Sequence, residues 1–191
     1  MDRDEVERLL LEEVEKRRGY ADHFDWPEKN LKEWGIVQTF KEEIERDGGP
    51  LIASCLQHPG GHEHLAPDYQ LTTHGGEVWG VEITELVNRQ AIERTKRGQD
   101  VFALWPDDEL QAKFRELVAK KDQPAKVSGG PYHRYVLLVH VDECMLPAER
   151  ISAVLATTTL ETRLIDEIYI LLSYDPGTQR YPLLKALTKK L

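Results

Sequence analysis

The sequence predicts a single α/β domain in which helices flank a mixed central β-sheet. Three observations support this prediction. Segments with helical spacing of apolar residues alternate along the chain with short apolar segments typical of strands. Turns rich in glycine and proline separate these segments. Because helices lie between strands, some connections must be crossovers, which give parallel strand pairs in the sheet.

The composition fits one soluble domain of ordinary size. The 191 residues are 40% hydrophobic and 31% charged, which is enough apolar material for a core. No apolar run approaches the roughly 20 residues of a membrane span, and the acidic start differs from a signal peptide. Cys55 and Cys144 do not suggest a disulfide framework. We therefore expect a cytoplasmic protein with no membrane partner.

The N-terminal part reads as a helical extension, about residues 1–29, followed by a core, about residues 30–141. An amphipathic helix is predicted from Arg3 to Arg18. A second helix is predicted from about Asn30 to Arg46, and its apolar side includes Leu31, Trp34, Val37, Phe40 and Ile44. The turn Asp47-Gly48-Gly49-Pro50 ends the second helix. Leu51 to Leu56 is short and apolar, which predicts the first strand.

The later elements alternate between helix and strand. The run from Tyr135 to Val141 is almost continuously apolar, which is typical of a central strand covered on both faces. Residues 142–191 are predicted as helix, strand and helix. The remaining expected elements are helices from after Leu86 to Arg97, from Asp107 to about Lys121 and from Pro147 to Leu155, a strand from Ile168 to Ser173, and a helical tail.

The most informative segment is a hairpin that places acidic side chains in an apolar sheet. Its strands are Tyr69 to Leu71 and Val78 to Leu86, joined by a turn at Gly75-Gly76. Asp68 begins the first strand, and Glu82 lies inside the second, fourteen positions later. These positions come close across the ladder of such a hairpin.

Two neighbouring carboxylates repel each other unless a cation lies between them, and Mg²⁺ is a cation that takes oxygen ligands. A simpler interpretation also exists for each residue alone. Asp68 follows a proline, as turn residues often do, and Glu82 would suit a strand with one face in water. A metal site explains both residues together.

The order of a helix, Pro67-Asp68, a turn, Gly80-Val81-Glu82-Ile83-Thr84, a helix and an apolar strand resembles the PD-(D/E)XK nuclease-like superfamily. The resemblance covers about Asn30 to Val141 and implies a restriction-endonuclease-like fold with a mixed four-stranded sheet. It also implies that Asp68 and Glu82 bind Mg²⁺ or Mn²⁺, and that the enzyme hydrolyses nucleic-acid phosphodiester bonds. The implied partner is nucleic acid, DNA more often than RNA, and a homodimer is common among enzymes that cut duplexes.

The chain departs from the superfamily at Thr84, which stands where the motif has a lysine. Threonine can donate a hydrogen bond but supplies no cation. Some members of the superfamily take the cation from the following helix, where Lys96 is a candidate. Gln90 and Arg94 lie on the same helix, and Lys113 and Lys121 lie on the next one. Spacing does not single out any of these residues.

The superfamily also often uses a glutamate on its first core helix, and Glu33 and Glu43 are the candidates here. At about 100° per residue, Glu33 falls between Val37 and Phe40 on the apolar side of that helix. Glu43 lies at the edge of the same side. Both remain candidates.

Two other groups of residues have a functional and a simpler interpretation. His58, His62 and His64 are a possible Zn²⁺ site of a hydrolase, or a solvated polar loop, which the short loop favours. Between Arg89 and Arg134, ten basic residues stand against seven acidic ones in a chain of net charge -9. This local excess predicts a phosphate-binding rim or, equally, solvated helix faces. The alternative to a nuclease is a catalytically inactive binding or scaffold module with the same fold.

Overall fold

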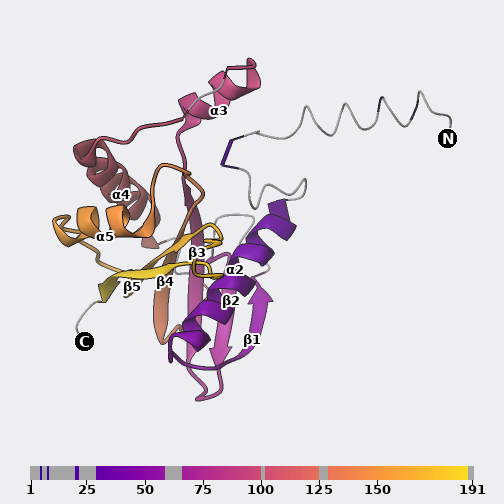
Figure 1. Cartoon of the computed structure of the whole chain (residues 1–191). Helices are drawn as coiled ribbons and strands as arrows, with labels where there is room; N and C mark the ends of the chain where they lie inside the picture. The colour runs from indigo at the N-terminus through magenta and orange to yellow at the C-terminus, as the bar shows by residue number, and fades with distance from the viewer. Residues whose placement is uncertain are drawn as a thin grey trace.

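The computed structural model describes residues 5, 8, 20, 21, 29–58, 66–99, 102–124 and 129–188. Within them, helices and a six-stranded sheet form an α/β fold, in which the strands lie side by side in their order along the chain (Figure 1). The strands are β1 (Ile52–Gln57), β2 (Tyr69–Thr73), β3 (Val78–Leu86), β4 (Arg134–Val141), β5 (Glu167–Leu172) and β6 (Leu183–Thr188). The helices are α2 (Lys29–Arg46), α3 (Arg89–Lys96), α4 (Asp107–Lys121) and α5 (Ala148–Ala156).

The sheet is mixed, as the sequence predicts. The pairs β1–β2, β2–β3 and β5–β6 are antiparallel, whereas β3–β4 and β4–β5 are parallel. The connection from β3 to β4 contains α3 and α4, and the connection from β4 to β5 contains α5. These helices are the crossovers that parallel neighbours require.

The two faces of the sheet are covered by different helices. On one face, α2 packs its buried residues Val37 and Phe40 against Trp79, Val81 and other sheet residues. On the other face, α4 and α5 pack against the opposite side chains of β3, β4 and β5. Figure 1 shows α2 in front of β2 and β3, with α4 and α5 grouped away from it. Each face therefore has its own apolar core.

Most predicted elements are present with bounds that differ by only a few residues, and β3 has the predicted bounds. The prediction of a helical tail is wrong, because residues 183–188 form β6 and pair with β5. The periodicity of a short apolar run does not distinguish a strand from a helix. Here the run forms a strand because it pairs with the edge of β5. The predicted four-stranded core is also extended to six strands by β5 and β6.

The structure also tests which residues the helices bury and how far the helices extend. Leu31 and Trp34 were expected on the apolar side of α2 but are 42% and 50% exposed, because the helix buries its middle and its C-terminal half. Glu5 and Arg8 are helical, and the rest of the predicted helix from Arg3 to Arg18 lies outside the described residues. Among the described residues, no helix has the length and apolar character needed to cross a membrane.

Candidate functional site

The β2–β3 hairpin brings Asp68 and Glu82 opposite each other. Tyr69 pairs with Val81 in the antiparallel ladder, so the next positions outward are Asp68 and Glu82. The Oδ2 atom of Asp68 accepts a hydrogen bond of 2.8 Å from the backbone N–H of Ile83. Both carboxylates are buried, with exposed fractions of 9% for Asp68 and 0% for Glu82.

Glycine at position 80 allows the chain before Asp68 to approach β3. A Cβ atom on Gly80 would lie 2.9 Å from Cγ of Pro67 and 3.1 Å from the ring of Tyr132. Real Cβ atoms do not approach other atoms so closely, so a side chain here would push Pro67 away. The Pro67-Asp68 and Gly80-Val81-Glu82 segments are therefore matched in shape.

The pKa of the Asp68 carboxyl is shifted by its burial and by the charges around it. Burial, followed by the negative charge of Glu82, raises the pKa of the Asp68 carboxyl to about 6. The charge of Glu33 acts in the same direction, whereas the hydrogen bond from Ile83 and the charge of Lys121 act against it. A divalent cation at this position would relieve the repulsion between the two carboxylates.

The cation that pairs with Glu82 comes from α4. Lys121, the last residue of that helix, donates through Nζ to Oε1 of Glu82. The two side chains are 14% and 1% exposed, so the ion pair is shielded from water. Lys121 was one of several candidates in the sequence, but one signal distinguishes it. It lies four positions after Leu117 and seven after Phe114, which places it on the buried side of α4.

Two contacts fix the end of α4 and hence the position of Lys121. The hydroxyl of Tyr135 donates to the backbone carbonyl of Lys121 at 3.2 Å. The carboxylate of Asp122 accepts the backbone N–H groups of three consecutive residues before β5, Arg163, Leu164 and Ile165, at 2.6, 2.8 and 3.0 Å. Neither contact was foreseen, since both join segments that are distant in the sequence.

Lys96 and Thr84, the other candidates for the role of the motif lysine, occupy different positions relative to Glu82. Lys96 is an exposed residue in the last turn of the short helix α3. Thr84 is half-buried on β3, two residues after Glu82 and therefore on the same face of the sheet. The geometry thus brings Lys121, rather than Lys96, to the carboxylates.

The structure separates the two candidate glutamates of α2. Glu33 has a side chain that is 12% exposed, and its charge raises the pKa of both Asp68 and Tyr69, so it lies near the hairpin. Glu43 accepts hydrogen bonds from Arg46 at 2.6 Å and from Arg180 at 2.7 Å. Glu43 therefore joins α2 to the segment before β6, and Glu33 is the one near the carboxylate pair.

The histidine loop is only partly described. His58 donates its backbone N–H to the carbonyl of Asp68 at 2.9 Å, which continues the β1–β2 pairing. His62 and His64 lie outside the described residues, so the Zn²⁺ prediction stays a prediction. Over the described ranges, no group of three or more His, Cys, Asp and Glu side chains is arranged to hold a metal ion.

The described basic residues between Arg89 and Arg134 are distributed over α3, α4 and β4 and the segments that join them. Lys113 pairs with Glu116 on the exposed side of α4, at 2.9 Å. Arg134 lies at the start of β4 and pairs with Glu167, at 2.6 Å. Lys126 lies outside the described residues.

The donor set of the hairpin suits Mg²⁺ or Mn²⁺. Such ions take one or two protein carboxylates and complete their coordination with water and substrate oxygens. Asp68 and Glu82 supply two carboxylates side by side, in a setting where their charges are only partly compensated by Lys121. The residues present therefore fit the ion that the motif implies.

Comparisons of the chain with protein-family models, curated proteins and solved structures give no match. Function must be inferred from the site itself.

Proposed function

We propose that this chain is a Mg²⁺-dependent nuclease-like enzyme that hydrolyses phosphodiester bonds of nucleic acid. The observation that carries the proposal is the buried cluster of Asp68, Glu82 and Lys121. The element order from α2 to β4 also supports it, because it follows the order that the PD-(D/E)XK resemblance implies.

Each residue has a distinct role in this proposal. Asp68 and Glu82 would hold the metal ion, which when bound lowers the pKa of a coordinated water and polarises a phosphoryl oxygen. Lys121 takes the part of the lysine that Thr84 replaces, and its fixed ammonium group offsets negative charge that develops on the phosphate. Glu33 adds negative charge near the pair and favours the bound cation.

The test is cleavage of labelled single- and double-stranded DNA and RNA with Mg²⁺ or Mn²⁺. We expect EDTA, Asp68→Asn and Glu82→Gln to abolish cleavage, and Lys121→Met to reduce kcat by about 100-fold. Lys113→Met changes a half-buried lysine of the same helix, which pairs with Glu116 rather than with the carboxylates of the site, and should cleave like the wild type. Folding of each variant is checked by circular dichroism, and full activity in folded Asp68→Asn protein would contradict the proposal.

The same assay tests the proposed partner. We propose DNA as the preferred substrate, in keeping with the superfamily resemblance, and a homodimer as the form that cuts duplexes. Preferential cleavage of RNA would exclude the first statement. A monomer that cuts both strands, shown by light scattering of the active protein, would exclude the second.

A catalytically inactive binding module is the second candidate. It is favoured by the ion pair itself, because Lys121 neutralises Glu82 without any metal. This alternative predicts that Mg²⁺ and Mn²⁺ leave the melting temperature unchanged. The enzyme instead predicts a rise in melting temperature that saturates with metal concentration and disappears in Asp68→Asn.

A further inference from the structure

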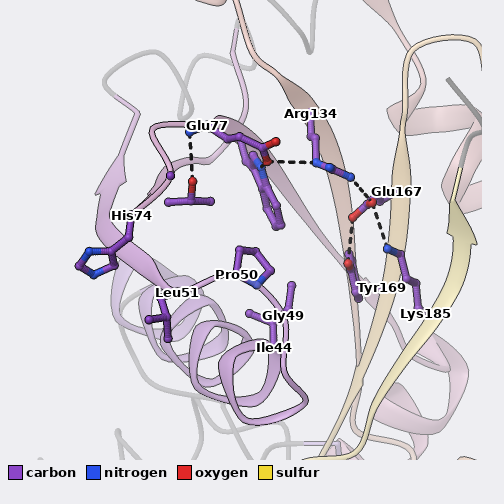
Figure 2. A pocket seen from close by; sticks show the side chains of 13 residues that line it. Ile44, Gly49, Pro50, Leu51, His74, Glu77, Arg134, Glu167, Tyr169 and Lys185 are labelled. Carbon is purple, nitrogen blue, oxygen red and sulfur yellow. Dashed lines mark hydrogen bonds and ion pairs between the residues drawn. The ribbon is translucent and has the colours of Figure 1, made fainter.

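A cavity lies on the α2 face of the sheet, remote from Lys121 and α4. It has a volume of about 620 Å³, which is in the range of small-molecule sites. Figure 2 shows its two sides, with Ile44, Pro50 and Leu51 facing a row formed by Arg134, Glu167 and Lys185. The side chains of Trp79 and Tyr169 also line the cavity.

The row of charged residues is organised by Glu167, which is 2% exposed. Its Oε1 atom accepts hydrogen bonds from Nη1 of Arg134 at 2.6 Å and from Nζ of Lys185 at 3.0 Å. Its Oε2 atom accepts the hydroxyl of Tyr169 at 2.8 Å. One buried carboxylate therefore holds two cations beside each other, as the dashed lines of Figure 2 show.

Each cation is also placed over an aromatic ring. The guanidinium carbon of Arg134 lies 5.4 Å from the centroid of the Trp79 ring, and Nζ of Lys185 lies 5.2 Å from that of Tyr169. These contacts restrict both side chains. Arg134 and Lys185 both line the cavity, and their side chains are 33% and 43% exposed.

The opposite wall is apolar and accessible. Leu51 is 60% exposed, and Pro50 precedes it in the turn between α2 and β1. Ile44, at the end of α2, continues this wall toward the sheet. An apolar surface that faces a pair of cations across a cavity suits a ligand with one apolar and one anionic part.

We propose that this cavity binds a small organic anion, with its carboxylate or phosphate at Arg134 and Lys185 and its apolar body against Pro50 and Leu51. Four charged side chains line the cavity, and their charges balance: Arg134 and Lys185 are positive, and Glu167 and Glu77 are negative. Glu167 is buried and already bonded to both cations, whereas Glu77 is 43% exposed and contacts Arg134 at the longer distance of 3.3 Å, so an anion would compete with Glu77 for Arg134.

The unused hydrogen-bond donors of the two cations support an anion. A guanidinium has five N–H donors and an ammonium has three. The contacts with Glu167 and Glu77 use Nη1 and Nε of Arg134 and one donor of Lys185. The geometry therefore leaves donors of both cations for a carboxylate or phosphate, independently of the proposed nuclease activity.

The test is an NMR titration of the ¹⁵N-labelled full chain with phenyl phosphate and with benzoate. The reporters are the indole N–H of Trp79, which donates to Glu77 at 3.0 Å, and the backbone amide of Leu51. We expect saturable shifts of these signals with at least one of the two anions, and the comparison identifies the preferred group. Benzyl alcohol, which has the ring without the charge, and inorganic phosphate, which has the charge without the ring, should bind at least about tenfold more weakly.

Two variants test the contributions of the charged wall and of the apolar wall to binding. Lys185→Gln retains the pair of Arg134 with Glu167, and Leu51→Asp changes an exposed residue, so both should remain folded. Each should weaken binding of the preferred anion by about tenfold, whereas Arg150→Gln, a control near α4, should not. The inference is overturned if neither anion gives saturable shifts, if benzyl alcohol or inorganic phosphate binds equally well, or if folded Lys185→Gln binds like the wild type.

Discussion

At the scale of single residues, Glu82 is the least expected side chain of the fold. It is fully buried in a strand whose other residues are mostly apolar, and a charge in such a place is stable only when it is paired. Lys121 supplies that pairing from another element. The same ion pair is therefore required by the fold and available to the chemistry.

Replacing Lys121 by methionine should reveal this dependence. The variant retains the aliphatic part of the side chain but leaves Glu82 buried without its cation, so we expect the free energy of unfolding to fall by about 3 kcal/mol. Urea unfolding at neutral pH measures the loss. Lys113→Met removes an exposed pair with Glu116 and should change stability by about 0.5 kcal/mol or less. Equal effects of the two substitutions would show that the buried pair contributes nothing special.

Asp68 should make stability depend on pH. Its pKa in the folded state is about 6, above its ordinary value, so the folded protein binds a proton that the unfolded chain releases. This contribution is fully present below about pH 4 and is lost as the pH rises through about 6. Asp68→Asn removes the charge, so we expect it to be more stable than the wild type by about 2 kcal/mol at pH 7.5 in the absence of divalent metal.

The difference should vanish below about pH 4, where Asp68 is protonated in both states. Urea unfolding of both proteins across this range, in EDTA, provides the measurement. Asp175→Asn is a control of opposite sign, because hydrogen bonds from Thr178 and Gly177 lower the pKa of Asp175. A stability difference for Asp68→Asn that is constant with pH would contradict the expectation.

At the scale of elements, hydrogen bonds to a segment distant in the sequence hold the end of α4 in place. Asp122 binds three backbone N–H groups of the segment before β5, and Ile165 in that segment is fully buried. These hydrogen bonds therefore join the helix, the loop and the start of β5 into one connected unit. Lys121 belongs to this unit, which positions its ammonium group next to Glu82 of β3.

Asp122→Ala should loosen that unit. It leaves three N–H groups without their acceptor, so we expect a loss of stability of about 2 kcal/mol. Faster hydrogen exchange at the amides of Leu164 and Ile165 is the direct measurement. Glu161→Ala changes an exposed residue of the same loop and should leave both amides as protected as in the wild type.

At the scale of the whole molecule, the sheet divides the apolar interior into two cores. Ile36 belongs to the core beneath α2, and Ile151 belongs to the core beneath α4 and α5. Side chains on opposite faces share few neighbours, so changes in the two cores should act independently.

This independence can be measured with Ile36→Val and Ile151→Val. Each residue is at most 2% exposed, so each substitution should cost about 1 kcal/mol. The double variant should lose the sum of the two costs to within about 0.5 kcal/mol. A larger coupling energy in urea unfolding would show that the sheet transmits strain between its faces.

Much of the fold follows from local patterns. The apolar run of β4 predicts a buried central strand, and the turn Asp47-Gly48-Gly49-Pro50 predicts the end of α2 at Arg46. The tail was misjudged because β6 depends on the free edge of β5, which no local pattern reveals. The exposure of Leu31 and Trp34 likewise depends on how far α2 extends beyond the sheet.

The sequence predicts only those residues of the candidate site that lie close together in the chain. Asp68 and Glu82 belong to one hairpin, and register predicts that they meet. Lys121 reaches Glu82 from a position 39 residues away in the sequence, so its selection required the packing of α4 on β3. The charged row at Arg134, Glu167 and Lys185 joins three strands and has no local signature.

The order of the strands has a consequence for how the chain is assembled on the ribosome. Each strand of the sheet is adjacent to the strand made immediately before it, from β1 to β6. A growing sheet of this kind never waits for a later segment to be inserted between two earlier ones. The hairpin with Asp68 and Glu82 can pair as soon as it emerges, whereas Glu82 acquires its lysine only after α4 has been synthesised. Vectorial synthesis therefore leaves the two carboxylates without their intrinsic counterion during this interval.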